Sequence, residues 1–357
     1  MRIALVHDDL MQWGGAEKVF AEISNIFPEA PIYTALADFK NPLILKNFKG
    51  KKIVTSFLQK IPFYRKLYKP LLPLYPIAFE QFDFSGFDLV ISHTTRFAKS
   101  IITKPETIHV CYIHTPPRFL WNFSGENPDF LPALLLLSLR KFDLISAKRV
   151  DFWIAGSKNC RQRLQKVYKV DSEVLYPFVD TEKYNPQNRF EGDYYLIISR
   201  LNKYKKVDVA LEAFKRSGKK LVVVGSGPEY KSLKNNISEK ISFLGKVSNE
   251  LLESLISGCQ ALIITAQEDF GMTAIEAQNF GKGVICFSKG GALETVINGK
   301  TGVYFEKQTP QSLNEAIDKF ESLKIEADDC LANANKFSKS NFKKKLLELV
   351  QKAMQIG

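Results

Sequence analysis

The sequence is poor in cysteine and histidine, and neither residue is arranged as a disulfide framework or a metal site. The 357 residues include five cysteines scattered singly, without a CxxC pair, and four histidines that all lie in the first third. Scattered cysteines argue against a disulfide-stapled scaffold and against a zinc ribbon. We therefore expect reduced thiols and a cytosolic protein.

Several well-known ligand and nucleophile motifs are also absent. The chain has no GxGxxG fingerprint, no GxxxxGK[ST] phosphate loop and no GxSxG nucleophile elbow, which disfavours NAD binding, P-loop chemistry and serine hydrolysis. No Asp-x-Asp pair is present to bridge a metal ion to a diphosphate, so we expect neither a metal nor another cofactor. No apolar run approaches the roughly 20 residues that a membrane-spanning helix needs.

What the chain does have is length and positive charge. A chain of 357 residues exceeds one ordinary core and suggests two domains of about 150–200 residues each. Its formal net charge of +12 would attract nucleic acid, anionic lipid or phosphorylated ligands, although it would equally serve solubility. The basic residues are spread along the chain and no nucleic-acid recognition motif is present, so a nucleic-acid-binding protein is the weaker alternative.

Short apolar runs alternate with helical patterns in both halves, which predicts an α/β fold with parallel sheets. The first series begins with a strand at 3–6 and a helix at 16–26, and it continues with strands at 88–92, 109–113, 152–155 and 174–176. The alternation restarts at 195–198, with further strands at 221–224, 241–244, 261–264 and 284–286. Between the two series, Pro177 and the polar residues from Thr181 to Asn188 suit a linker. We therefore place the domain boundary between residues 178 and 179.

The segment from Phe57 to Phe84 interleaves aromatic residues, prolines and bases on a partly helical pattern. Such a mixture suits the headgroup layer of a membrane. The alternative is a pair of core-packing helices with a basic outer face.

The residues from Glu268 to Glu276 carry the strongest chemical pattern. Glu268 falls in the loop after the strand at 261–264, and a helix is predicted from Thr273 to Phe280. The backbone amides of Phe270, Gly271, Met272 and Thr273 then lie near a helix N-terminus, which favours an anion or a hydroxyl-rich ligand. Because carboxylates accept several hydrogen bonds, Glu268 and Glu276 together could grip vicinal hydroxyls.

Cations and glycines follow other strands. Arg200 comes directly after the strand at 195–198, with Lys205 close behind, and two cations at a strand end suit a phosphate clamp. Gly225 follows the next strand, and Gly14 and Gly15 open the first helix, where bare amides could meet a diphosphate. His114 follows the strand at 109–113 and precedes two prolines, so we expect it at the ligand-binding edge of the first sheet.

Together these segments resemble the retaining family 4 glycosyltransferases, which have the GT-B fold. The resemblance runs along nearly the whole chain, and its remaining segments are His7-Asp8, Thr115 to Trp121, Tyr176 to Asp180, Gly290 to Glu294 and Thr301 to Val303. The segments His114-Thr115-Pro116 and Gly290 to Val296 look most like mannosyltransferases of bacterial surface-polysaccharide (O-antigen) assembly.

The resemblance implies two Rossmann-like domains facing across a cleft. Residues 1–178 would form the acceptor-side domain, and residues 179–339 would bind the nucleotide sugar. The final helix, within 340–357, would cross back to the N-terminal domain.

The resemblance also implies a role for each site residue. Arg200 and Lys205 would hold the diphosphate of the sugar donor, helped by the amides of Gly14 and Gly15. Glu276 would bind the ribose, Glu268 the transferred sugar, and His114 would lie on the acceptor side of that sugar. The family is thought to react by front-side attack, in which the departing phosphate oxygen accepts the acceptor's proton.

The implied reaction moves mannose from GDP-mannose to a glycan or a lipid-linked oligosaccharide. A UDP-sugar donor, a sugar-nucleotide epimerase and a phosphorylase remain alternatives, although no lysine context suits the pyridoxal phosphate of a phosphorylase. A membrane-anchored acceptor would explain residues 57–84 as a peripheral contact on the cytoplasmic face.

Overall fold

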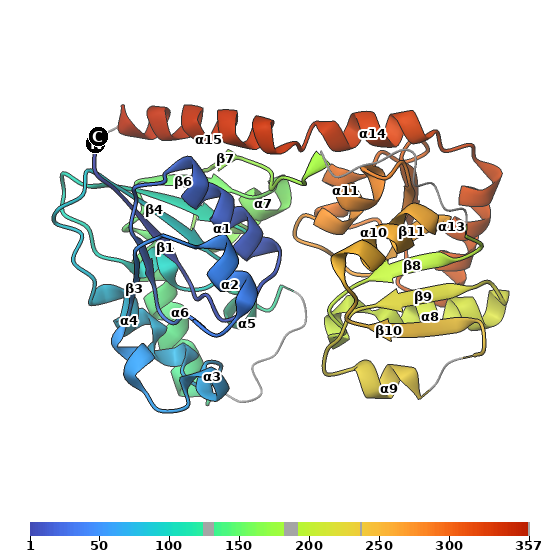
Figure 1. Cartoon of the computed structure of the whole chain (residues 1–357), viewed down its shortest axis with the longest axis horizontal. Coiled ribbons are helices and arrows are strands. Elements are labelled where there is room, and N and C mark those ends of the chain that lie inside the picture. The colour runs from blue at the N-terminus through green and yellow to red at the C-terminus, as the bar shows by residue number, and fades with distance from the viewer. Residues whose placement is uncertain (124–131, 182–191, 236–237, 356–357) are drawn as a thin grey trace. The chain divides into compact units, whose positions relative to one another are not determined.

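The computed structural model describes residues 1–123, 132–181, 192–235 and 238–355. It divides into two compact units, Met1–Tyr176 with the segment from Phe342 onward, and Pro177–Asn341. The boundary lies two residues before the one expected from the sequence. The greater part of the expected linker, 182–188, lies outside the described residues. Figure 1 shows the elements of each unit, which are described here one unit at a time.

The first unit contains a parallel sheet of seven strands in the order β3-β2-β1-β4-β5-β6-β7. Its strands are β1 (Ile3–His7), β2 (Ile32–Thr34), β3 (Ile53–Thr55), β4 (Leu89–Thr94), β5 (Ile108–Ile113), β6 (Phe152–Ala155) and β7 (Glu173–Val174). Strands β4 and β6 are buried along their whole length, as strands of a sheet covered on both faces should be, and β4 carries polar Ser92, His93 and Thr94 at its end.

The helices of the first unit vary in length. They are α1 (Gly15–Ile26), α2 (Pro42–Asn47), α3 (Tyr64–Leu67), α4 (Tyr75–Glu80), α5 (Arg118–Trp121), α6 (Ala133–Ala147) and α7 (Lys158–Val167), with 3-10 turns at Phe57–Lys60, Leu72–Leu74 and Ala98–Ser100. One core cluster joins residues of β1 and β4 to Tyr75, Phe79 and Leu139. A second joins β5 and β6 to Leu164 of α7.

The last helix, α15 (Lys339–Met354), joins the first unit from Phe342 onward, as predicted. Its buried side chains are Phe342, Leu346, Leu349, Val350 and Ala353. The Phe342 ring lies edge-on to Tyr112 of β5, with 6.1 Å between ring centroids. Because these residues recur at three- and four-residue spacing, they form one apolar face that the sheet covers.

The second unit contains a parallel sheet of six strands in the order β10-β9-β8-β11-β12-β13. The strands are β8 (Tyr195–Ile198), β9 (Leu221–Val224), β10 (Ile241–Gly245), β11 (Ala261–Ile264), β12 (Gly283–Phe287) and β13 (Gly302–Phe305). The helices are α8 (Val207–Ser217), α9 (Tyr230–Lys234), α10 (Asn249–Gly258), α11 (Met272–Gln278), α12 (Ala292–Thr295), α13 (Pro310–Ser322) and α14 (Ala327–Asn335), with a 3-10 turn at Lys203–Lys205.

Alternate side chains of the second sheet enter two different cores. Tyr195 and Ile197 of β8 pack in one cluster with α8 and α13, whereas Leu196 packs in the other with α10 and α11. This alternation follows from the two-residue period of a strand. The two clusters confirm that helices cover both faces, so the predicted α/β architecture with two Rossmann-like domains is confirmed (Figure 1).

The segment from Phe57 to Phe84 packs into the core of the first unit, and its expected contact with a membrane stays a prediction. Tyr75 and Phe79 are fully buried in the first unit's core, whereas Phe63 is 76% exposed and Ile77 59% exposed. The segment is therefore a core-packing element that also presents apolar side chains outward. Among the described helices of the whole protein, none is both long and apolar enough to cross a membrane.

Candidate active site

The chemistry-bearing loops of the second unit leave neighbouring strands at one edge of the sheet. Arg200 and Lys205 follow β8, Gly225 follows β9, Glu268 follows β11 and Gly290 follows β12. In a parallel sheet the carboxyl ends of all strands lie at the same edge, which is where α/β proteins bind ligands. Apart from Gly14 and Gly15, which belong to the first unit, the residues predicted for the sugar-donor site thus follow the central strands at one edge of this sheet.

Lys205 and Glu268 form an ion pair there. The Lys205 Nζ lies 2.6 Å from Glu268 Oε1 and 2.8 Å from Oε2. The two side chains are only 14% and 18% exposed, so water screens the pair weakly. The Lys205 carbonyl also accepts a hydrogen bond of 2.7 Å from the Thr265 hydroxyl, which anchors the turn between β8 and α8 to β11. The two residues were predicted separately, and the structure brings them into contact.

A small pocket opens beside this pair, with a volume of about 10 Å³, which is room for about one water molecule. It is lined by Ser199, Lys205, Thr265, Glu268 and Thr273, together with apolar residues of β8 and β11. One cation, one carboxylate and three hydroxyls therefore meet over the ends of two strands. Such a lining can bind an anion and a hydroxyl-rich group next to each other.

Arg200 presents a second cation at the same strand end. Its side chain is exposed, and its guanidinium makes no hydrogen bond or ion pair with any residue the structure describes. Its carbonyl accepts from the Asn202 amide at 2.9 Å, which holds the loop in a tight turn. An exposed guanidinium on a fixed loop is suited to bidentate phosphate binding.

Paired glycines hold the loop that carries Glu268. The Gly291 amide donates to the Glu268 carbonyl at 2.8 Å. A Cβ at Gly290 would lie 2.3 Å from that carbonyl oxygen, and a Cβ at Gly291 would lie 2.2 Å from the Phe270 Cα. Any larger residue at these two positions would push the Glu268 loop away. In the sequence this glycine pair contributes only to the family resemblance, and its packing role is visible only in the structure.

Gly225 has a similar packing role beneath Arg200. Its φ of +136° is a conformation that side-chain-bearing residues rarely adopt, and a Cβ there would lie 1.8 Å from the Ser199 carbonyl oxygen. Two residues later, a Cβ at Gly227 would lie 2.4 Å from the Leu201 carbonyl. The two glycines let the loop after β9 pack directly on the Arg200 loop. The predicted contact of Gly225 with the sugar donor stays a prediction.

The predicted amide cluster lies at the start of α11. Gly271 has a φ of +94° and precedes the helix, and Met272 and Thr273 are its first two residues. Phe270 turns its ring into the unit, where it is 6% exposed and packs on Phe337 at 5.6 Å. Glu276 lies on the same helix and is half-buried. The Phe270 ring is therefore turned away from the pocket, and the predicted contact of its amide with a ligand stays a prediction.

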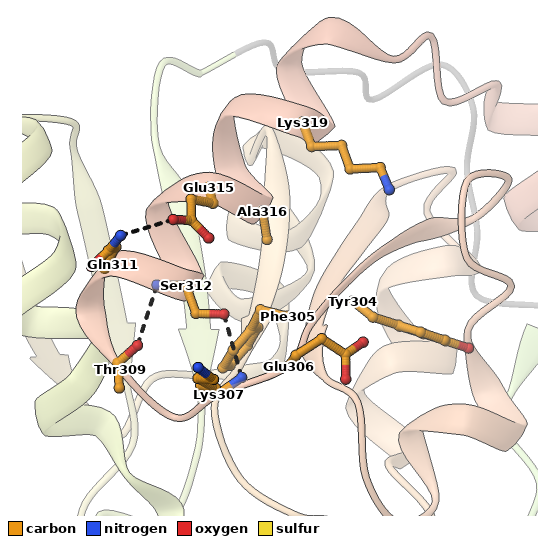
Figure 2. Close-up of a pocket in the computed structure, with 10 residues that line it drawn as sticks. All are labelled: Tyr304, Phe305, Glu306, Lys307, Thr309, Gln311, Ser312, Glu315, Ala316 and Lys319. Carbon is orange, nitrogen blue, oxygen red and sulfur yellow. Dashed lines mark hydrogen bonds between the residues drawn. The ribbon is translucent and has the colours of Figure 1, made fainter.

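A larger hollow of the second unit lies away from these residues. It has a volume of about 350 Å³ and is lined by residues of β13, of α13 and of the loop between them, including Lys307, Thr309, Ser312 and Glu315. Figure 2 shows that several of its polar groups bond one another, as when the Lys307 amide donates to the Ser312 hydroxyl at 3.3 Å. The hollow contains none of the residues predicted for the site, and we assign it no chemistry.

In the first unit, Gly14 and Gly15 open α1 as predicted. Gly14 is the N-cap in extended conformation and makes no side-chain cap, so the first amides of α1 depend on other partners. Beside it lies a feature that the sequence analysis missed. The carboxylate of Asp8 accepts hydrogen bonds from the amides of Thr95, Phe97 and Ala98 at 2.6–2.9 Å.

The Asp8 carboxylate is fully buried, yet it stays ionised. Burial acts to raise its pKa, but His7, the Arg96 guanidinium and the amide hydrogen bonds together lower the pKa below its usual value. Asp9 pairs with Arg96 and accepts from the Tyr75 hydroxyl at 3.1 Å. Two adjacent aspartates thus tie the loop after β1 to the loop after β4. Only the position of Asp8 and Asp9 at a strand end could have indicated this role.

His114 lies directly after β5, half-buried, as predicted for the ligand edge of the first sheet. It is not isolated. Its Nε2 lies 2.9 Å from Nε2 of His93, a fully buried residue of β4. The following residue, Thr115, accepts a hydrogen bond of 2.9 Å from buried Arg163, which fixes the start of the loop. The assignment of His114 to the acceptor side stays a prediction.

Two family models match consecutive parts of the chain. The model of glycosyltransferase family 4 matches residues 13–183, and that of the glycosyl transferases group 1 matches residues 180–337. The two matches overlap at residues 180–183, a few residues after the boundary between the structural units at Tyr176 and Pro177. They cover every residue predicted for the site, from Gly14 to Glu276.

Several relatives of known sequence are also named as glycosyltransferases. An uncharacterized glycosyltransferase of Methanocaldococcus jannaschii is 33% identical over 187 residues, and the match spans 50% of this chain and about half (52%) of that relative. An α-1,3/1,6-mannosyltransferase of Kluyveromyces lactis is 24% identical over 83% of this chain and 71% of the relative. Its Dictyostelium discoideum counterpart is 23% identical, with 85% of each chain covered.

Solved structures share the fold. Anabaena HepE, solved with UDP and glucose, superposes with a TM-score of 0.73 at 18% identity, covering 98% of this chain and 99% of that one. The sucrose-phosphate synthase of Thermosynechococcus elongatus gives a TM-score of 0.74 at 14% identity over the full length of both chains. At these identities the likeness supports the fold alone.

Proposed function

The chain is a glycosyltransferase with the GT-B fold, and we propose that it moves mannose from GDP-mannose to a glycan or lipid-linked oligosaccharide. The proposed reaction retains the anomeric configuration, needs no metal and serves cell-surface polysaccharide synthesis. The mannose assignment is supported by the mannosyltransferase names of several relatives. It also agrees with the mannosyltransferase-like segments at His114 and Gly290.

The Lys205–Glu268 pair, with the exposed Arg200 at the end of the same strand, is the observation that carries the proposal. A sugar donor would bring a diphosphate to Arg200 and Lys205. Lys205 would then exchange its carboxylate partner for phosphate oxygens, and Glu268 would become available to the sugar hydroxyls. Glu276, on the helix that begins beside the pocket, would bind the ribose. The ion pair thus keeps both groups in place before the ligand arrives.

The chemistry follows from where charge develops. The bond between the anomeric carbon and the phosphate oxygen breaks, which leaves an oxocarbenium-like sugar and a nucleoside diphosphate. Fixed cations that stabilise the departing charge lower the barrier, because they are stronger partners for the transition state than for the ground state. The acceptor oxygen then bonds to the anomeric carbon from the same face, and its proton passes to the departing phosphate oxygen. With two cations placed by the protein, a bridging metal ion is unnecessary.

A UDP-sugar is the second candidate donor. The specific observation in its favour is the likeness to HepE, which was solved with UDP and glucose and also with UDP-glucose. Ligand stabilisation separates the two, because, at equal concentration, the ligand that binds the folded state more tightly raises the melting temperature more. We expect GDP and GDP-mannose to raise it more than UDP and UDP-glucose do, and the reverse order would move the assignment to a UDP-sugar.

Contact with an anionic membrane would bring the enzyme to a lipid-linked acceptor. In the first unit, Phe63, Ile77 and Leu134 expose 76%, 59% and 80% of their surface, and Lys66 and Lys69 are exposed on the same 57–84 segment. Apolar side chains interleaved with bases suit the headgroup layer. Flotation with vesicles of acidic phospholipid at low salt should carry the protein upward, and Phe63→Ser with Ile77→Ser should abolish this. No flotation of the wild-type protein would remove the membrane from the proposal.

A further inference from the structure

Both backbone polar groups of Lys205 are hydrogen-bonded. Its amide donates to the Asn202 carbonyl at 2.9 Å, within the 3-10 turn that follows β8. Its carbonyl accepts from the Thr265 hydroxyl at 2.7 Å, and Thr265 directly follows β11, the neighbour of β8 in the sheet. The turn is therefore fastened both within itself and to the adjacent strand.

Gln308 fastens Thr265 in the same way. Its Nε2 lies 2.7 Å from the Thr265 carbonyl oxygen, and because that oxygen can only accept, the amide group of Gln308 donates. Gln308 lies in the loop between β13 and α13, and β12 lies between β13 and β11 in the sheet. This side chain therefore links the loops of two strands that are not neighbours. The hydrogen bonds run in one series from Gln308 through Thr265 to Lys205.

The loop that carries Gln308 is itself held firmly. The next residue, Thr309, is the N-cap of α13 and accepts from the Ser312 amide at 3.3 Å. On the other side of Gln308, the Lys307 amide donates to the Ser312 hydroxyl at 3.3 Å (Figure 2). Both neighbours of Gln308 are thus tied to the first turn of α13, so its side chain reaches Thr265 from a fixed base.

Lys205 has a particular need for such support. A lysine carries its charge at the end of a flexible four-carbon chain, so the position of the charge depends on a fixed backbone. The residue after it, Lys206, has a φ of +53°, a left-handed conformation that is unfavourable for any residue with a side chain. Such a conformation persists only where the surrounding contacts impose it. Without the bond from Thr265, the turn would therefore tend to relax.

We propose that Thr265 and Gln308 are positioning residues that hold Lys205 in place for the diphosphate of the sugar donor. Thr265 acts through the Lys205 carbonyl, and Gln308 acts through Thr265. The restraint on the turn follows from the contacts alone, whereas its consequence for the diphosphate rests on the proposed function. When the Lys205 ammonium leaves Glu268 for phosphate oxygens, its backbone stays where the unliganded protein holds it, so little order has to be gained on binding.

Four substitutions separate the hydrogen bonds from packing. Thr265→Val keeps the shape of the side chain without its hydroxyl, and Thr265→Ser restores the hydroxyl. Gln308→Met keeps the approximate length of the side chain without its donor. Gln311→Met is the matched control, because Gln311 is an exposed glutamine of the same region that bonds Glu315 instead of Thr265.

Hydrogen exchange of the unliganded protein tests the restraint without any ligand. We follow the amides of residues 202–206 at exchange times short enough for strand β9 to stay protected. Thr265→Val and Gln308→Met should each speed exchange of the turn by up to about tenfold, the effect of one lost hydrogen bond. Thr265→Ser and Gln311→Met should exchange as the wild-type protein does. Unchanged exchange of the turn in Thr265→Val or Gln308→Met would overturn the proposal, as would loss of protection in β9, because these residues would then hold the fold instead of the turn.

Isothermal titration with GDP tests the consequence for binding. Thr265→Val and Gln308→Met should each weaken GDP binding by about 3- to 10-fold, and Thr265→Ser should restore it. Because Gln308 acts through Thr265, adding Gln308→Met to Thr265→Val should cost less than about a further twofold, and fully additive losses would overturn this order. If the wild-type protein did not bind GDP, the proposed function would fail, and hydrogen exchange would still decide whether the two residues hold the turn.

Discussion

Replacing Glu268 by glutamine should tighten the binding of the product nucleotide while it abolishes transfer. In the free protein the Lys205 Nζ sits 2.6 Å from the Glu268 carboxylate. A diphosphate must compete with that carboxylate for the lysine. Glutamine keeps the size of the side chain and removes its charge, so a carboxylate at this position no longer competes with phosphate for Lys205.

The size of the effect follows from the ion pair. Two unit charges about 4 Å apart attract by about 4 kcal/mol near a protein surface. Part of this energy is offset because the Glu268 carboxylate, once released by Lys205, regains some contact with water, although both side chains are only 14% and 18% exposed in the pair. A net gain of about 1–2 kcal/mol corresponds to about 5- to 30-fold tighter GDP binding. Lys205→Met should instead weaken GDP binding by about 10- to 100-fold, since it removes a phosphate partner.

Isothermal titration of GDP into the wild-type protein and the two variants measures these changes. Lys203→Ala is the matched control, because Lys203 is an exposed lysine of the same turn and should leave affinity unaltered. Glycosyl transfer by Glu268→Gln should fall at least about 100-fold, as expected when a contact to the reacting sugar is lost. If Glu268→Gln weakened GDP binding as much as Lys205→Met, the exchange of partners at Lys205 would be refuted.

Further predictions concern loop packing, a buried ion pair and pH. Gly291→Ala should displace the Glu268 loop, destabilising the fold by about 1–3 kcal/mol and lowering transfer, whereas Gly86→Ala, with its nearest neighbour 3.9 Å away, should do neither. Lys99→Met should cost about 3–5 kcal/mol in urea unfolding, because it leaves Asp143 charged at 0% exposure, and adding Asp143→Leu should recover part of this. Burial lowers the pKa of His109 to about 4. Between pH 6.5 and 4 the unfolded chain therefore binds a proton there that the folded chain does not, so stability should fall by up to about 3 kcal/mol as pH decreases.

The sequence predicted those parts of the fold that depend on local pattern. Buried strands such as Phe152–Ala155 and Tyr195–Ile198 appear with the predicted bounds, because a continuous apolar run between turns has few other solutions. Strands of three residues, Ile32–Thr34 and Ile53–Thr55, were missed because such runs are too short to show a period. β13 was missed as well, because it begins with Gly302 and leaves an apolar run of only three residues.

The candidate site was predictable only as separate residues. Strand ends pointed to Arg200, Lys205, Glu268 and His114, but which side chains meet depends on tertiary packing. Lys205 and Glu268 are 63 positions apart, and His7 and His93 are 86 apart, so no sequence window contains either pair. The sequence likewise presented His114 as a lone histidine, although its partner comes from the neighbouring strand.

The most direct test of the account is a transfer reaction in excess chelator. The wild-type enzyme is incubated with GDP-mannose and a lipid-linked oligosaccharide, and GDP release and the anomeric configuration of the product are followed together. We predict undiminished release with an α-linked product from the α-linked donor, and at least about 100-fold slower release by Arg200→Ala. An inverted product, a requirement for metal, or equal activity of Arg200→Ala would contradict the account.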